Sequence, residues 1–366
     1  MNTQELLSPA ISRPRPVVSF PASQSLQASS ALNAGAISTG LAQLDDAISP
    51  PSTEQMERDT QGIPQGQVTE IFGPPGVGKT SLALNVAINA LRADEKVVWI
   101  DTGSPLPRQR LYDMLQKSIQ ESKSTLRVEE LVKNITHVRA QSLPHLLALL
   151  LHTPSGFPPE GCKLLVIDSA SGPIHSYFPN PTELRSRLAQ SKNIDKAQVQ
   201  WLMNRSSNVT SDLANQLAKL ATTHQMAVLA INQMRTRIRG QPRATLCPVL
   251  SGGSWESSIS TRLVLYRDFA MTEASGGIRF AEVMKRGGKT LSLRLEENIA
   301  LFVIEKDGLR ALDDNTSPRM AAIETEKPQD SSAHRKRKLE EIADSEEDDS
   351  DAEYGWVDDD AALLEP

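Results

Sequence analysis

The segment GPPGVGKT, residues 73–80, has the composition and spacing of a loop that binds phosphate groups. Its glycines allow successive backbone N–H groups to surround an anion, and the helix that follows adds a favourable dipole. Lys79 is expected to reach the terminal phosphates of ATP, and the hydroxyl of Thr80 to ligate Mg²⁺. The sequence therefore predicts a site for ATP and Mg²⁺, and its cofactor-binding residues are Gly73, Pro74, Pro75, Gly76, Val77, Gly78, Lys79, Thr80 and Ser81.

A phosphate loop also needs an acidic side chain on a neighbouring strand to position the Mg²⁺. Asp168 ends the apolar run KLLVIDS at 163–169, and the carboxyl ends of strands are where open α/β sheets bind ligands. Asp101 ends a second apolar run, VVWID, and is the alternative magnesium ligand. A role as a strand-end cap fits Asp101 equally well. Thr102 and Gly103, which follow it, cannot act as a general base.

The segments around these residues alternate between strand and helix patterns. Helical spacing is present over 80–91, near 108–120 and 142–152, and at about 209–224. Strands are expected at 67–72, 97–101, 163–169, 226–233, 262–267, 277–285 and 300–306. This alternation predicts an α/β fold with a mostly parallel central sheet flanked by helices. Because no helices separate the last strands, antiparallel strands are expected at one edge.

Both ends of the chain differ in composition from its middle. Residues 1–37 are rich in Pro, Ser, Ala and Gln and lack periodicity, which is typical of a disordered arm. A disordered tail is expected over 313–366, with the basic block RKRK at 335–338 and an acidic run at 340–366. The basic block favours a nuclear location. The predicted organisation is thus an arm, a folded core over 38–312, and a tail.

Net charge, cysteine content and the length of the apolar runs indicate which partners and which cellular compartment suit the chain. The chain has 39 Lys and Arg against 45 Asp and Glu, and the acidic run holds 13 of those acids and no basic residue. The remainder, 39 against 32, is mildly basic, which suits either a polyanionic partner or a surface that is charged for solubility. Cys162 and Cys247 have no metal-ligand spacing, which indicates two thiols in a reducing compartment. The apolar run near 145–152 is too short to cross a membrane, so no membrane partner is expected.

Taken together, several segments resemble the core of the RecA-type recombinase family over about 38–312. Within that family the chain is most similar to the eukaryotic recombinase paralogues, and in particular to fungal mediators of homologous recombination. The segments that carry the resemblance are STGLAQLDDAI (38–48), GIPQGQVTEIFGPPGVGKTSLALNVA (62–87), WIDTGSPLPRQRL (99–111), LLVIDS (164–169), LAINQ (229–233) and LSGGSWESSISTRLVLYR (250–267).

The resemblance implies a RecA-like phosphate-loop ATPase core in which Lys79, Asp168 and Gln233 act in catalysis. Thr80 and Asp168 would hold the metal, and Gln233 would sense the terminal phosphate and pass its state to a DNA-binding loop at 234–248. That loop has no acidic residue, and the implied DNA-binding residues are Arg235, Arg237, Arg239 and Arg243. Arginines in such a loop bind a phosphate backbone without reading bases. A solvated basic loop is the alternative, because no aromatic residue lies among the arginines.

The sequence departs from active members of the family in two places. The strand that ends at Asp101 is followed in those members by Thr-Glu, and that Glu activates the water that attacks ATP; here Gly103 takes its place. ATP binding with at most slow, DNA-dependent turnover is therefore expected. Active recombinases also carry a helical DNA-binding domain ahead of the core, and residues 1–37 are too few and too polar to supply one. Phe20 and Ala22 only loosely resemble the family's Phe-x-x-Ala docking segment.

Two functions remain compatible with the sequence. In the first, the chain is an ATP-binding paralogue in the nucleus that pairs with another recombinase paralogue. It would assist assembly or stabilisation of the main recombinase filament on single-stranded DNA in homologous recombination and double-strand break repair. In the second, it is an active DNA-dependent ATPase that performs strand exchange itself. Residues 177–208, which are basic and include Trp201, could contact DNA or pack on a partner subunit.

Overall fold

The computed structural model describes most of the predicted core and little of either end. The described residues all lie within Met1–Pro318, the first of two units of the chain, whereas the second unit, Arg319–Pro366, lies outside them. The expected acidic tail and nearly all of the expected N-terminal arm, with Phe20 and Ala22, are also outside. The structure describes residues 35–49, 61–122, 127–178, 196–237, 245–267, 277–292 and 295–312.

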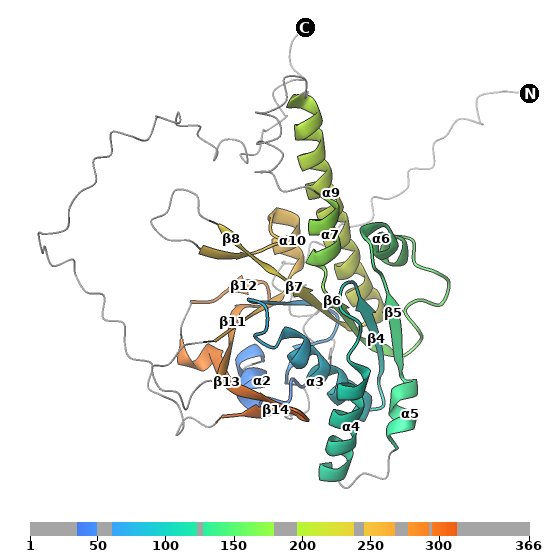
Figure 1. Ribbon diagram of the computed structural model, residues 1–366, viewed down its shortest axis with the longest axis vertical. Coiled ribbons are helices and arrows are strands. Elements are labelled where there is room, and N and C mark those ends of the chain that lie inside the picture. The colour runs from blue at the N-terminus through green and yellow to red at the C-terminus, as the bar shows by residue number, and fades with distance from the viewer. Residues whose placement is uncertain are drawn as a thin grey trace, which may run out of the picture. The chain divides into compact units, whose positions relative to one another are not determined.

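A large mixed sheet forms the centre of the fold, as the strand and helix patterns predict (Figure 1). Its strand order is β14-β13-β11-β10-β3-β7-β6-β4-β5, and β12 pairs with β11. The strands from β10 to β5 along this order are parallel, and those from β10 to β14 are antiparallel. In chain order these strands are β3 (Val68–Phe72), β4 (Lys96–Asp101), β5 (Ile135–Arg139), β6 (Cys162–Asp168), β7 (Ala227–Asn232), β10 (Thr261–Tyr266), β11 (Arg279–Arg286), β12 (Lys289–Thr290), β13 (Ile299–Glu305) and β14 (Gly308–Ala311).

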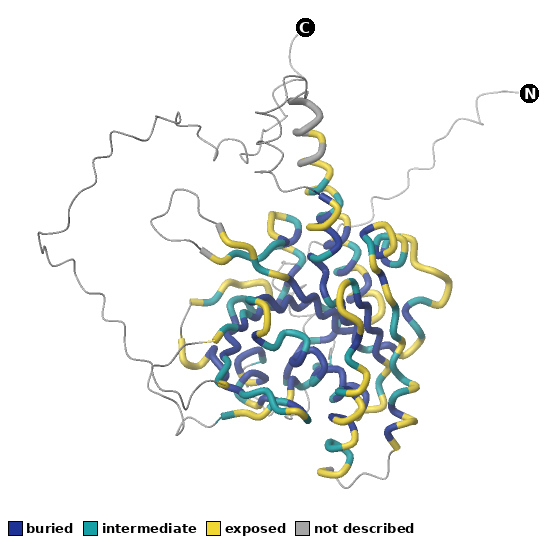
Figure 2. The backbone as a smooth tube through the Cα atoms, viewed as in Figure 1, coloured by how far each residue is buried: buried dark blue, intermediate teal, exposed yellow. Residues whose placement is uncertain are grey.

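Helices cover both faces of this sheet and form two cores with it (Figures 1 and 2). On β4, Val97 and Trp99 join one core while Val98 and Ile100 join the other. Because successive side chains of a strand point to opposite faces, a strand buried on both faces needs an unbroken apolar run. The first core contains α2 (Ala42–Ile48), α3 (Lys79–Arg92), α4 (Arg108–Ser122) and α5 (Val128–Lys133). The second contains α6 (Leu143–Leu151), α7 (Ser171–Tyr177), α9 (Lys196–His224) and α10 (Gly253–Ser258).

The register of the parallel strands places their carboxyl ends at one edge of the sheet. Asp101 on β4 is paired with Asp168 on β6, and Asp168 with Ile231 on β7. On the other side of β7, Asn232 is paired with Phe72, the last residue before the phosphate loop. The loops that follow these strands therefore meet at this edge, where ligands of such sheets bind.

Several elements of the structure were not expected from the sequence, and three of these differences concern the candidate site. The edge strand β5 was not expected, because its sequence ITHVR is short and half polar. Helix α9 begins at Lys196 instead of at about 209, so residues 196–208 of the basic segment 177–208 are helical. The expected loop at 234–248 begins and ends as an antiparallel strand pair, β8 (Met234–Arg237) and β9 (Thr245–Pro248). We call this pair the basic hairpin.

Three short elements complete the fold. Strands β1 (Ala36–Ile37) and β2 (Ile63–Pro64) pair, so the described fold includes residues just before the expected boundary at 38. The short helix η3 (Glu296–Asn298) precedes β13. Among the described helices, none has both the length and the apolar composition of a membrane span.

Candidate functional site

The phosphate-loop segment connects β3 to α3 in a backbone conformation that requires glycine. Gly78 has a φ of 106°, in the region that residues with a side chain rarely adopt. At Gly73, an added Cβ would lie 2.3 Å from the carbonyl oxygen of Leu265 on β10. The loop thus packs directly against a neighbouring strand and leaves its backbone free to surround an anion.

Lys79, the first residue of α3, has its ammonium inside this loop. Its Nζ donates hydrogen bonds to the carbonyl oxygens of Gly73 at 2.7 Å and Pro74 at 2.9 Å. Burial lowers the pKa of Lys79, and the nearby charge of Asp168 opposes that shift. The ammonium therefore lies where a phosphate bound by the loop would meet it.

The structure brings Thr80 and Asp168 together at the end of β6. The Thr80 hydroxyl donates to Oδ2 of Asp168 over 2.7 Å. Burial raises the pKa of Asp168, while the Thr80 hydrogen bond and Lys79 oppose the rise. A hydroxyl and a carboxylate side by side are oxygen donors of the kind that Mg²⁺ prefers, so this pair fits a magnesium ion.

Asp101, the alternative acid, has other partners. Its carboxylate is fully buried, and Oδ2 lies 2.5 Å from Nε2 of His137 on β5. Nδ1 of the same imidazole lies 3.2 Å from Nη2 of Arg108. Asp101 therefore connects β4 to its neighbouring strand, and Asp168 is the acid that contacts Thr80.

Gly103 lies in the exposed turn after β4, at the same edge of the sheet. The turn is fastened to the residue after Asp168, because the Thr102 hydroxyl donates to the Ser169 carbonyl at 2.8 Å and accepts from its N–H at 2.9 Å. A Cβ at Gly103 would meet no atom within 4 Å, and its φ is outside the left-handed range. Neither backbone conformation nor crowding requires glycine here, so a larger side chain would fit.

Two arginines that the sequence did not single out line the cavity beside the loop. Arg110 comes from α4 and Arg279 from β11. With Ile304 they line a cavity of about 340 Å³ whose other lining residues are Gly76, Gly78, Lys79, Thr80 and Ser81. Burial lowers the pKa of Arg279, and the charges of Arg267 and Arg110 add to the effect. No local motif marks these residues, since they converge only through the order of the strands.

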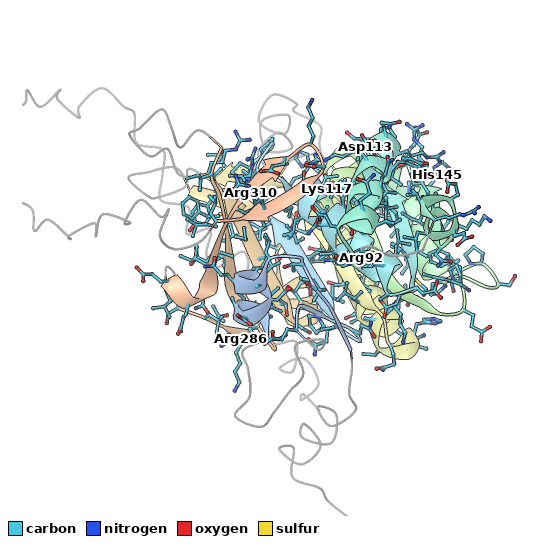
Figure 3. All side chains as sticks on the ribbon, turned by 90° about the horizontal axis from the view of Figure 1, so that it is seen from below. Arg92, Asp113, Lys117, His145, Arg286 and Arg310 are labelled. Carbon is cyan, nitrogen blue, oxygen red and sulfur yellow. The ribbon has the colours of Figure 1, made fainter. Side chains whose placement is uncertain are left out.

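A wider cavity of about 730 Å³ shares Arg110 and Ile304 with the first. It lies between the start of α4 and the end of β13. Lys117 of α4 (Figure 3) forms an ion pair of 2.8 Å with Asp307, in the turn after β13. The cavity next to the loop therefore continues toward α4. Its other lining residues are Pro107, Arg108, Gln109, Asp113, Glu305 and Lys306.

Gln233 joins β7 to the basic hairpin. It therefore lies at the edge of the sheet that also carries the phosphate loop. Its N–H donates to the Ser171 hydroxyl at 2.9 Å, and its side-chain Nε2 lies 3.5 Å from the Ser169 hydroxyl. The next residue begins β8, on which Arg235 is exposed and Arg237 is the last residue. The remaining expected DNA-binding residues, Arg239 and Arg243, lie outside the described residues.

Two exposed aromatic residues of the basic segment 177–208 come from α7 and α9. Tyr177 is 52% exposed at the end of α7, and Trp201 is 54% exposed on α9. The Arg205 guanidinium lies over the Trp201 ring, 5.0 Å from its centroid. Residues 179–195, between these helices, are outside the described part of the chain.

Comparison with known proteins gives a family match over most of the described core. The model of the Rad51 family matches residues 37–268, which is more than half of the chain. DNA repair protein rhp55 of Schizosaccharomyces pombe is 26% identical over 253 residues, which cover 59% of this chain and 72% of that protein.

Two further relatives match over a similar part of the chain. DNA repair protein RAD51 homolog 3 of Dictyostelium discoideum is 26% identical over 225 residues, 56% of this chain and 53% of the relative. DNA repair protein RAD51 homolog 2 of Homo sapiens is 24% identical over 256 residues, 63% of this chain and 59% of the relative. The chain thus spans little more than half the length of these two relatives.

Proposed function

This chain belongs to the Rad51 family, and from that membership we propose that it is an ATP-binding recombinase paralogue of homologous recombination. It assists the assembly or stabilisation of a recombinase filament on single-stranded DNA and pairs with another paralogue in the nucleus. The relatives named as DNA repair proteins support the repair role.

The residues at the edge of the sheet fit ATP and Mg²⁺. The backbone of Gly73 to Thr80 and the ammonium of Lys79 would hold the phosphates, and Arg110 and Arg279 would add positive charge from the facing side of the cavity. Thr80 and Asp168 would hold the metal. A bound Mg²⁺ neutralises charge that develops on the phosphates.

The observation that carries the proposal is the missing carboxylate at Gly103. Among the described residues at this edge, Asp168 is bonded to Thr80, and Asp101 is fully buried with Oδ2 against His137, so neither is placed to activate a water. Loss of a general base commonly costs about a hundredfold or more in rate. ATP in this protein therefore acts chiefly as a ligand that stabilises assembly.

The basic hairpin supports a role on DNA. Arg235 is exposed on β8, two residues after Gln233, whose side-chain Nε2 lies 3.5 Å from the Ser169 hydroxyl at the sheet edge that carries the phosphate loop. Contacts between arginine side chains and DNA phosphates give binding that is independent of the base sequence and is weakened by salt. Gln233 would sense the terminal phosphate, and the hairpin would track the DNA backbone.

Steady-state ATP turnover, with and without single-stranded DNA, tests the nucleotide part of the proposal. We expect tight ATP binding with slow turnover in the wild type, loss of binding in Lys79→Ala, and turnover raised at least about tenfold in Gly103→Glu. Gly103→Gln is the matched control, because it adds the same volume without a carboxylate, and it should stay slow. Fast, DNA-stimulated turnover in the wild type that is lost in Lys79→Ala would instead indicate an active recombinase.

A filament assay tests the mediator part separately. The lifetime of a Rad51-family recombinase on single-stranded DNA would be measured with and without this protein, in ATP and in ADP. A longer lifetime in ATP is expected. An unchanged lifetime, at concentrations where the protein binds both DNA and ATP, would contradict the mediator role.

A further inference from the structure

A buried carboxylate at the middle of the sheet connects the strand before the phosphate loop to the base of the basic hairpin. Glu70, on β3, is fully buried and is three residues before Gly73. Burying a charge is costly unless it is paired and hydrogen-bonded, so its surroundings indicate what it holds in place.

Three side chains donate to this carboxylate. Nδ2 of Asn232 and Nε1 of Trp255 donate to Oε1 at 2.6 and 2.9 Å, and Nε of Arg262 donates to Oε2 at 2.5 Å. Burial raises the pKa of Glu70, and Arg262 opposes the rise most strongly. The three donors come from β7, α10 and β10.

Arg262 continues the network to helix α10. Its other guanidinium nitrogens bind the carboxylate of Glu256 at 2.9 and 2.7 Å. Lys285 of β11 is half-buried, and its ammonium donates to the backbone carbonyl of Glu256 at 2.6 Å. Through Arg262, the helix that follows the basic hairpin is also attached to Glu70.

Asn232 closes the base of the basic hairpin. Its Nδ2 donates to the Leu250 carbonyl at 3.0 Å, and its Oδ1 accepts from the Leu250 N–H at 3.2 Å. A backbone bond from Val249 to the Gln233 carbonyl, at 2.9 Å, lies beside this pair. The residues just before β8 and just after β9 are therefore held together by one amide side chain, and Glu70 holds that amide.

We propose that Glu70 is a positioning residue that, through Asn232, holds the basic hairpin in a defined orientation against the strand leading into the phosphate loop. The consequence for DNA rests on the proposed function. A hairpin fixed at its base presents Arg235 to a phosphate backbone at a smaller loss of conformational entropy than a loose one.

Two variants that each remove one donor from Oε1 of Glu70 provide a matched test. Asn232→Ala also removes both side-chain bonds to Leu250, whereas Trp255→Phe leaves the hairpin base intact. We expect Asn232→Ala to raise amide hydrogen exchange across 233–250 by about tenfold and to weaken single-stranded DNA binding about fivefold or more. Trp255→Phe should change neither, at a temperature at which both variants are folded.

Glu70→Leu tests the carboxylate itself with a modest change of volume, and Arg262 keeps Glu256 as a partner. A Leu side chain has no acceptor, so Asn232 loses its partner on β3, and faster exchange across the hairpin is expected. Unchanged exchange in folded Glu70→Leu, or equal loosening in Asn232→Ala and Trp255→Phe, would overturn the proposal. A wild type that binds no single-stranded DNA would overturn the proposed function instead, and the exchange pattern would still decide the role of Glu70.

Discussion

The Thr80 hydroxyl and the Asp168 carboxylate are joined by a hydrogen bond of 2.7 Å, although 88 residues separate them in the chain. The loop that starts α3 and the end of β6 reach this contact because β7 alone separates β3 from β6 in the sheet. The pair distinguishes Asp168 from Asp101, which has the same position at the end of the neighbouring strand.

This pairing predicts a magnesium-specific loss in Asp168→Asn. Nucleotide affinity in Mg²⁺ should fall about tenfold or more, because the variant removes the charge that a divalent ion needs. In EDTA the variant and the wild type should bind nucleotide alike. Asp101→Asn is the control, since Asp101 contacts His137, and an equal Mg²⁺-dependent loss in that variant would contradict the assignment.

The two glycines Gly73 and Gly76 are expected to respond differently to alanine. At Gly76 the φ of 75° costs a residue with a side chain about 1–2 kcal/mol, but no atom lies within 4 Å of an added Cβ. At Gly73 the Cβ would meet the Leu265 carbonyl oxygen at 2.3 Å, so the loop must move away from β10. Nucleotide titration and thermal unfolding should show the larger loss in Gly73→Ala, and equal losses would contradict the described packing.

Cys162 is expected to make the fold less stable as the pH rises through the alkaline range. Burial raises the pKa of its thiol from 9.0 to about 11. Between these values the unfolded chain loses the proton and the folded chain keeps it, so the free energy of unfolding should fall by about 1.4 kcal/mol per pH unit. Urea unfolding at pH 9 to 11 measures the slope, and Cys162→Ala should lack this contribution. Identical slopes would show that the thiol stays protonated equally in both states.

Arg235 is predicted to contribute one phosphate contact. In Arg235→Gln the slope of log affinity for single-stranded DNA against log salt should become shallower by about 0.7. Arg92→Gln provides the control, because Arg92 is exposed at the carboxyl end of α3, remote from the end that begins at the phosphate loop (Figure 3). A slope that changes equally in both variants would indicate a general charge effect.

Much of the fold can be predicted from the sequence because its signals are local. The glycines of residues 73–80 encode a backbone conformation, and an unbroken run such as that of β4 encodes burial on both faces. Short or half-polar elements were missed because they carry no strong local signal. The edge strand β5 and the strands of the basic hairpin have weak patterns of their own and form through pairing with neighbours.

The sequence by itself determined the phosphate loop, the class of the fold and the glycine at position 103. Only the tertiary structure decided that Asp168 contacts Thr80, that Arg110 and Arg279 face the loop, and that Glu70 holds Asn232. The physical reason is the order of the strands. Contacts across 88 or 162 residues depend on which strands pair and in which register, and no segment of the chain encodes that alone.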